Sequence, residues 1–167
     1  EMIERISHKL GHLGGTLDPH ACFLLHRGMK TLALRIKYQN ESAQKIAEFL
    51  ELRKEIEKVN YPGLTSSKYH KRAAELFSGF GGMISFVIKG GEPAAEKFIK
   101  ELTLPVYAPS LGGVETLITL PSKTSHAGLT DSEKKAQGIS GGLIRLSVGI
   151  ENTRDLINDF EHAFSSL

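Results

Sequence analysis

Residues 143–148 read Leu-Ile-Arg-Leu-Ser-Val, and this stretch decides the fold class of the chain. Its short apolar run predicts a β-strand, the clearest in the sequence. Because successive side chains of a strand point to opposite faces, Arg145 shares a face with Leu143 and Ser147, and the opposite face is wholly apolar. The stretch therefore predicts a sheet with one buried face and a single cation on the other.

Working outward, the hydrophobic spacing predicts helices that alternate with short strands. Asp18-Pro19 has the composition of a helix start, Thr130 with Glu133 forms a capping-box pattern, and Pro62-Gly63 indicates a turn. Gly28 argues against one unbroken helix over 18–36. The predicted helices are 1–10, 18–36, 40–54, 68–77, a segment that begins at Glu92-Pro93, a short helix after Thr130 and a last helix from Asn152. The other predicted strands are 59–61, 83–88, 104–108 and 115–120. We therefore expect an α+β fold: a small, mostly antiparallel sheet of about four to five short strands, covered by helices on one side.

Composition excludes several classes of function. The chain has 167 residues, a length typical of one domain. Its 21 basic and 19 acidic residues give a net charge of only +2, which is too small to favour binding to nucleic acid or to a membrane surface. Its apolar runs are too short to span a membrane. Cys22 is the only cysteine, which excludes an internal disulfide and favours a reducing cytoplasm. We expect Cys22 to be a small buried apolar residue.

The usual catalytic and metal-binding patterns are absent. His8 and His12 stand four residues apart, but Gly11 lies between them and no glutamate follows His8, so the zinc-protease pattern fails. The other histidines form no ligand cluster with the cysteine, and we expect no metal site. A Gly-x-Ser-x-Gly nucleophile motif is also absent.

Arg145 is the residue that most needs a partner. A guanidinium inside an apolar strand is costly unless it meets an anion or reaches a cleft. One interpretation is a structural ion pair or an outward-facing side chain. The other is bidentate capture of a ligand carboxylate, for which the planar fork of arginine is suited. The residues alone leave both open.

Six motifs, in order along nearly the whole chain, resemble the family of cystathionine γ-synthase, cystathionine γ-lyase and methionine γ-lyase. They occupy residues 25–32 (Leu-His-Arg-Gly-Met-Lys-Thr-Leu), 59–64 (Val-Asn-Tyr-Pro-Gly-Leu), 79–86 (Gly-Phe-Gly-Gly-Met-Ile-Ser-Phe), 110–117 (Ser-Leu-Gly-Gly-Val-Glu-Thr-Leu), 124–127 (Thr-Ser-His-Ala) and 138–151 (Gly-Ile-Ser-Gly-Gly-Leu-Ile-Arg-Leu-Ser-Val-Gly-Ile-Glu). The resemblance implies a fold-type I enzyme that uses pyridoxal 5'-phosphate (PLP) and is homotetrameric at full length.

The resemblance also implies roles for individual residues. The arginine matching Arg145 grips the α-carboxylate of the amino-acid substrate, and the serine matching Ser110 lines the site near it. The hydroxyl matching Ser125 lies at the side-chain end of the substrate. Many members have a glutamate where this chain has Pro109, and losing that carboxylate removes a partner for a distal ammonium group. Lys123 does not lie in the family's cofactor-lysine motif.

The resemblance therefore predicts that residues 1–167 are the C-terminal small domain of such an enzyme, with 1–36 as the connection and long helix from a missing PLP-binding large domain. We expect this domain to bind the substrate carboxylate during γ-replacement or γ-elimination on homoserine-derived sulfur amino acids. We expect no catalytic or cofactor-binding residue within it, and no activity from it alone. The alternative is a free-standing, non-catalytic domain that binds a partner chain or a small carboxylate.

Overall fold

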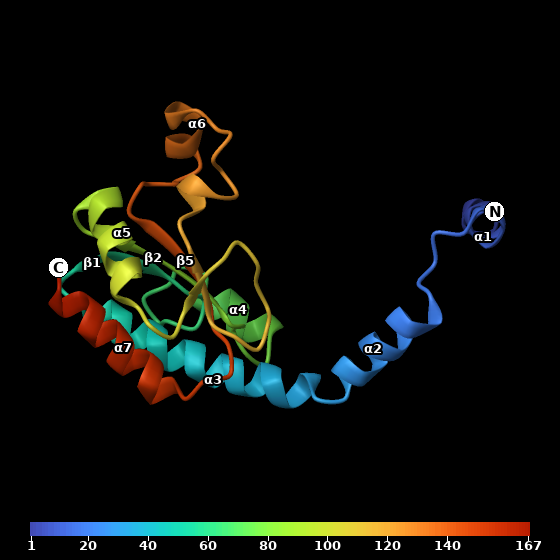
Figure 1. Ribbon diagram of the computed structural model, residues 1–167, viewed down its shortest axis with the longest axis horizontal. Helices are drawn as coiled ribbons and strands as arrows, with labels where there is room; N and C mark the ends of the chain where they lie inside the picture. The colour runs from blue at the N-terminus through green and yellow to red at the C-terminus, as the bar shows by residue number, and fades with distance from the viewer. The chain divides into compact units, whose positions relative to one another are not determined.

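The computed structural model describes all 167 residues and divides them into two compact units, Glu1–Leu34 and Arg35–Leu167. Helix α3 (Leu32–Glu51) carries the chain from the first unit into the second. Figure 1 traces these elements from the N-terminus to the C-terminus. The two units are described separately.

The first unit contains two exposed helices, α1 (Met2–Leu13) and α2 (Pro19–Met29), with no buried residue in either. The Asp18 side chain accepts hydrogen bonds from the backbone N–H groups at the start of α2, at 2.9 and 3.1 Å, which confirms the predicted helix start. Gly11 does not end α1; the helix ends at Gly14, whose φ of 78° suits glycine. Cys22 is exposed, so its predicted burial is wrong.

The prediction of a single helix over 18–36 is also wrong, as the presence of Gly28 indicated. Helix α2 ends at Met29, where the Lys30 N–H bonds the Arg27 carbonyl in a tightened final turn, and α3 begins at Leu32. The predicted helix 40–54 thus starts eight residues too late. Residues 32–36 fall within the preceding predicted helix 18–36, so the helical spacing is found there and only the break between the two helices is misplaced.

The second unit is built around a five-stranded sheet in the order β1-β2-β5-β4-β3. Its strands are β1 (Ile56–Asn60), β2 (Met83–Ile88), β3 (Val106–Tyr107), β4 (Leu117–Thr119) and β5 (Leu143–Ser147). All neighbours are antiparallel except the pair β3 and β4. The predicted α+β fold class with a mostly antiparallel sheet of four to five short strands is confirmed.

One face of this sheet forms the hydrophobic core. Ile144 and Leu146 of β5 pair with Phe86 and Ile84 of β2, and all four are buried in a single apolar cluster. That cluster includes side chains from α3, α5 (Gly91–Glu101) and α7 (Thr153–Ser165). The Phe98 ring lies 6.1 Å from that of Phe86, centre to centre. Truncating such a ring costs about 3–5 kcal/mol, so this face fixes the sheet firmly.

Three shorter helices complete the unit: α4 (His70–Leu76), the 3₁₀ turn η1 (Pro121–Lys123) and α6 (Asp131–Ala136). The predicted capping box is present, because Thr130 and Glu133 exchange side-chain and backbone hydrogen bonds. Asn152 caps α7 as predicted. None of the helices combines the length and apolar character needed to span a bilayer.

Candidate functional site

A row of polar side chains crosses the sheet on the face opposite the core. Arg145 of β5 is paired directly with Ser85 of β2 and with Thr119 of β4. Asn60 of β1 is paired with Ser85, and its amide donates a 3.1 Å hydrogen bond to the Ser85 hydroxyl. Directly paired residues lie about 5 Å apart on the same face. Antiparallel pairing thus assembles a polar strip across four strands, with Arg145 in it.

The guanidinium of Arg145 has two carbonyl partners and no carboxylate partner. Its Nη2 donates to the backbone oxygens of Pro109, at 2.7 Å, and of Ser110, at 2.8 Å. It forms no salt bridge with any Asp or Glu of the chain. Its Nε is buried and has no hydrogen-bond partner. Buried polar groups are nearly always paired, so an unpaired N–H at this position is unusual.

The loop that supplies those carbonyls is itself tied to the sheet. The Ser147 hydroxyl, two residues along β5 from Arg145, accepts a 2.9 Å hydrogen bond from the Gly112 N–H. The Gln39 amide of α3 donates to the Gly113 carbonyl at 2.8 Å. The φ of 76° at Gly112 is one that residues with a Cβ rarely adopt. The loop therefore holds a fixed position beside the guanidinium.

Glu151 closes the same region from the end of β5. Its carboxylate accepts from the Thr116 backbone N–H, at 2.6 Å, and from the Thr116 hydroxyl, at 2.7 Å. The Thr116 hydroxyl in turn accepts from the Gly149 N–H at 2.9 Å. This network joins the start of β4 to the segment after β5, so these two parts of the chain are fixed relative to each other.

The structure brings two of the three predicted site residues together. Ser110 contacts Arg145, but through its backbone carbonyl, and its side chain is exposed. Ser125 is exposed and its hydroxyl bonds the neighbouring His126 Nδ1 at 2.8 Å, with no contact to Arg145. Sequence reasoning did not single out Asn60, Ser85 or Thr119.

Lys123, which lies outside the family's cofactor-lysine motif, is held by two carboxylates. Its ammonium lies between Glu92, at 2.9 Å, and Glu96, and hydrogen bonds to these carboxylates raise the pKa of the amine well above its ordinary value. A lysine that attacks an aldehyde must first lose its proton. The two carboxylates therefore favour the protonated form of Lys123, which does not suit covalent binding of PLP.

The fold and this site define a domain that presents one half-buried arginine, held by two backbone carbonyls and without a carboxylate partner, on the non-core face of a mixed sheet. The family model for "Cys/Met metabolism PLP-dependent enzyme" matches residues 1–165, and the chain belongs to that family. PLP is thus the cofactor of its family.

Individual relatives are consistent with this family membership. The chain is 44% identical over 163 residues to a cystathionine beta-lyase of Lactococcus lactis subsp. cremoris, covering 98% of the chain and 43% of the relative. It is 40% identical to the cystathionine gamma-lyase of Bos taurus, covering 98% of the chain and 40% of the relative. The chain thus spans about two fifths of the length of these curated relatives.

Solved structures have the same fold. A crystal structure of cystathionine gamma-lyase from Lactobacillus plantarum, complexed with L-serine, matches with a TM-score of 0.89 and 37% identity over 99% of the chain and 43% of the solved one. A putative O-acetylhomoserine (thiol)-lyase from Campylobacter jejuni, solved with a pyridoxyl-lysine phosphate, also matches with a TM-score of 0.89, at 36% identity over 98% of the chain and 39% of the solved one.

Proposed function

We propose that residues 1–167 are the C-terminal, substrate-carboxylate-binding domain of a PLP-dependent transsulfuration enzyme. The reaction is γ-replacement or γ-elimination on a homoserine-derived sulfur amino acid. Residues 1–36 connect this domain to a large domain that holds PLP. The many exposed apolar side chains of α1 and α2 support the proposal, because such side chains normally pack against another part of a protein. We propose a cytoplasmic homotetramer for the full-length enzyme.

The unpartnered Nε of Arg145 is the observation that carries the proposal. With Nη2 held by two carbonyls, the guanidinium plane is fixed, and Nε is left to donate to one oxygen of a carboxylate. Charge-assisted hydrogen bonds of this kind are about twice as strong as neutral ones. An amino-acid substrate brings such a carboxylate, and binding it supplies both the missing partner and the missing negative charge.

The residues of this chain position the substrate, and bound PLP supplies the electron sink for the chemistry. Arg145 fixes the α-carboxylate and therefore the orientation of the bonds at the α-carbon. Ser110 places one wall beside that carboxylate. Ser125, exposed on the loop after η1, lies at the side-chain end of the substrate in this proposal, and its bond to His126 is then exchanged for one to the substrate.

Pro109 bears on which substrate is used. Its carbonyl holds Arg145, and its side chain offers no charge for a distal ammonium. This favours homoserine esters or methionine-type substrates over cystathionine. A second candidate reaction is β-elimination, which is favoured by the 44% identity to a protein named cystathionine beta-lyase. Product analysis separates them, since γ-elimination of cystathionine releases cysteine and β-elimination releases homocysteine.

The test is Arg145→Leu in the full-length PLP-loaded enzyme. Loss of the charge-assisted hydrogen bond from Nε is expected to lower kcat/KM by about 10- to 150-fold, mostly through KM, since such a bond contributes roughly 1.5–3 kcal/mol. Arg145→Lys keeps the charge without the fork and should recover only part of the loss. Arg154→Leu, at an exposed arginine of α7, is the control. An unchanged KM in Arg145→Leu would refute the assigned role.

The alternative of a free-standing interaction domain is not favoured by membership of an enzyme family. It predicts that the full gene product has no activity on any sulfur amino acid. Recovery of PLP-dependent turnover from the full-length protein would exclude it.

A further inference from the structure

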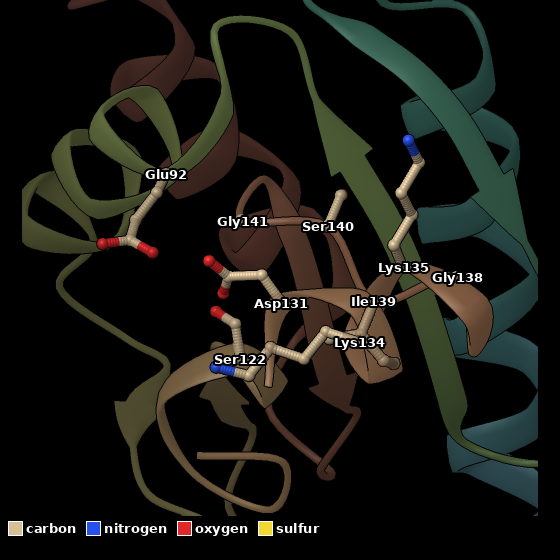
Figure 2. Close-up of a pocket in the computed structure, with 9 residues that line it drawn as sticks. All are labelled: Glu92, Ser122, Asp131, Lys134, Lys135, Gly138, Ile139, Ser140 and Gly141. Atoms are coloured by element: carbon tan, nitrogen blue, oxygen red, sulfur yellow. The ribbon is translucent and has the colours of Figure 1, made fainter. Parts of the chain in front are cut away.

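A separate cavity lies beyond the amino-terminal end of β5, between α5, η1 and α6. Its volume is about 400 Å³, and none of Arg145, Ser110 and Ser125 lines it. Small-molecule sites have volumes of roughly 300–1,000 Å³, so it is large enough for a compact ligand. Figure 2 shows its lining side chains.

The cavity contains a buried polar atom that lacks a partner. Ser122 is only 9% exposed, and its hydroxyl oxygen is buried with no hydrogen-bond partner. In Figure 2 this hydroxyl points between the carboxylate of Asp131 and the ammonium of Lys134. An unsatisfied buried hydroxyl costs about 1–3 kcal/mol, so its presence at the wall of a cavity points to a ligand that satisfies it.

Two charges on α6 face this cavity without partners. Asp131 and Lys134 lie three residues apart on the same helix, yet neither makes a salt bridge. Lys134 reaches toward Ser122, whereas the neighbouring Lys135 extends in another direction, away from Asp131 (Figure 2). A separated carboxylate and ammonium, with a hydroxyl between them, form a site that carries both signs of charge.

The opposite wall is held in place. Lys123 of η1 bridges Glu92 and Glu96 of α5, which ties the turn that carries Ser122 to that helix. A Cβ on Gly141 would meet the Glu92 Cβ at 3.0 Å, so the chain after α6 approaches α5 closely at the cavity. The cavity is therefore bounded by fixed elements on this side.

The charges select the class of ligand. Among the lining residues, Lys134 and Lys135 are balanced by Glu92 and Asp131, so the lining is neutral overall. A neutral lining gives no net attraction to a phosphate dianion or to a polyamine. No group of three or more His, Cys, Asp or Glu is placed to hold a metal ion. A zwitterion suits both signs, and the half-buried Ile139 supplies an apolar contact.

We propose that this cavity binds a free α-amino acid with a short apolar side chain, at a site separate from that of Arg145. Its carboxylate lies between the Lys134 ammonium and the Ser122 hydroxyl, its ammonium faces Asp131, and its side chain lies against Ile139. This inference does not depend on the proposed enzymatic reaction. It depends on the cavity, the buried hydroxyl and the two unpaired charges.

The experiment uses L-norleucine, a zwitterion with an apolar side chain and no leaving group. Binding to the full-length protein carrying Arg145→Leu, which lacks the carboxylate contact of the other site, is followed by the Ile139 methyl resonance. We expect saturable shifts, with hexanoate and pentylamine, which each lack one charge, binding at least tenfold more weakly. The absence of a saturable shift up to about 10 mM norleucine, or equal binding of all three probes, overturns the proposal.

Variants of the lining residues sharpen the test. Lys134→Gln and Asp131→Asn should each weaken norleucine binding at least tenfold, and the matched control Lys135→Gln less than twofold. Ser122→Ala should weaken binding several-fold while leaving the thermal midpoint of the ligand-free protein unchanged or raised, since it removes an unsatisfied buried hydroxyl. Unweakened binding in Ser122→Ala and Lys134→Gln would place the ligand elsewhere and overturn the proposal.

Discussion

Replacing Ser147 by alanine tests whether the loop that holds Arg145 is positioned by the sheet. Ser147 is 2% exposed, and its hydroxyl accepts the Gly112 N–H at 2.9 Å. One neutral hydrogen bond contributes about 0.5–1.5 kcal/mol, and Gly112 is exposed enough for water to replace part of it. We therefore expect a loss of about 1 kcal/mol in the free energy of unfolding, from urea denaturation.

The functional effect should be separable from this small loss of stability. With the loop loosened, the Pro109 and Ser110 carbonyls fix the guanidinium less tightly, and a shift of this kind should raise KM for the amino-acid substrate about three- to tenfold with a smaller change in kcat. The control is Ser165→Ala, which removes a 2.6 Å bond from an exposed serine to the His162 carbonyl at the end of α7. Equal KM values in Ser147→Ala, Ser165→Ala and wild type would refute the positioning argument.

The remaining predictions concern the ionisation of two side chains and the retention of the cofactor. The hydrogen bond and charge of Lys123 lower the pKa of Glu96 below its ordinary value of 4.5. The pair therefore stabilises the fold above pH 4.5, and this stabilisation is lost as the pH falls through the lowered pKa. The difference in thermal midpoint between wild type and Glu96→Gln should vanish at that lower pH. Burial and the nearby Glu48 charge raise the pKa of Tyr61 to about 12, so one of the four tyrosines should ionise well above pH 10 in an ultraviolet titration and normally in the unfolded chain. The 167-residue chain alone, mixed with PLP and dialysed, should retain no cofactor absorbance, and a retained band would contradict the assignment of the PLP lysine to another domain.

Elements with local signals were predictable from the sequence. Strand β2 has the predicted bounds 83–88, because glycine pairs flank a mostly apolar run of strand-forming residues. The helix after Thr130 was found from its capping box. The start of α3 was not, because the apolar helical spacing continues through residues 30–31, where α2 and α3 are separated, and so does not mark the break.

The site was only partly predictable, for a different reason. Arg145 was found because a charge inside an apolar strand is locally anomalous. Asn60, Ser85 and Thr119 are ordinary polar residues on three other strands, and only the pairing register brings them beside it. Ser147 could have been suspected, because it shares the face of Arg145 two residues along the strand. The partner carbonyls of Pro109 and Ser110 carry no side-chain signal at all.

Strand β5 links the core to the site, because one of its faces packs in the core and the other carries site residues. Ile144 and Leu146 are fully buried on one face, and Arg145 and Ser147 lie on the other. A register slip of one residue would turn Arg145 into the core and the two apolar side chains out of it, so the hydrophobic effect specifies the register strongly. The position of the guanidinium is therefore enforced by residues that never touch it. Conservative substitutions in the core face, which leave the register intact, should then cost stability without changing how Arg145 binds a carboxylate.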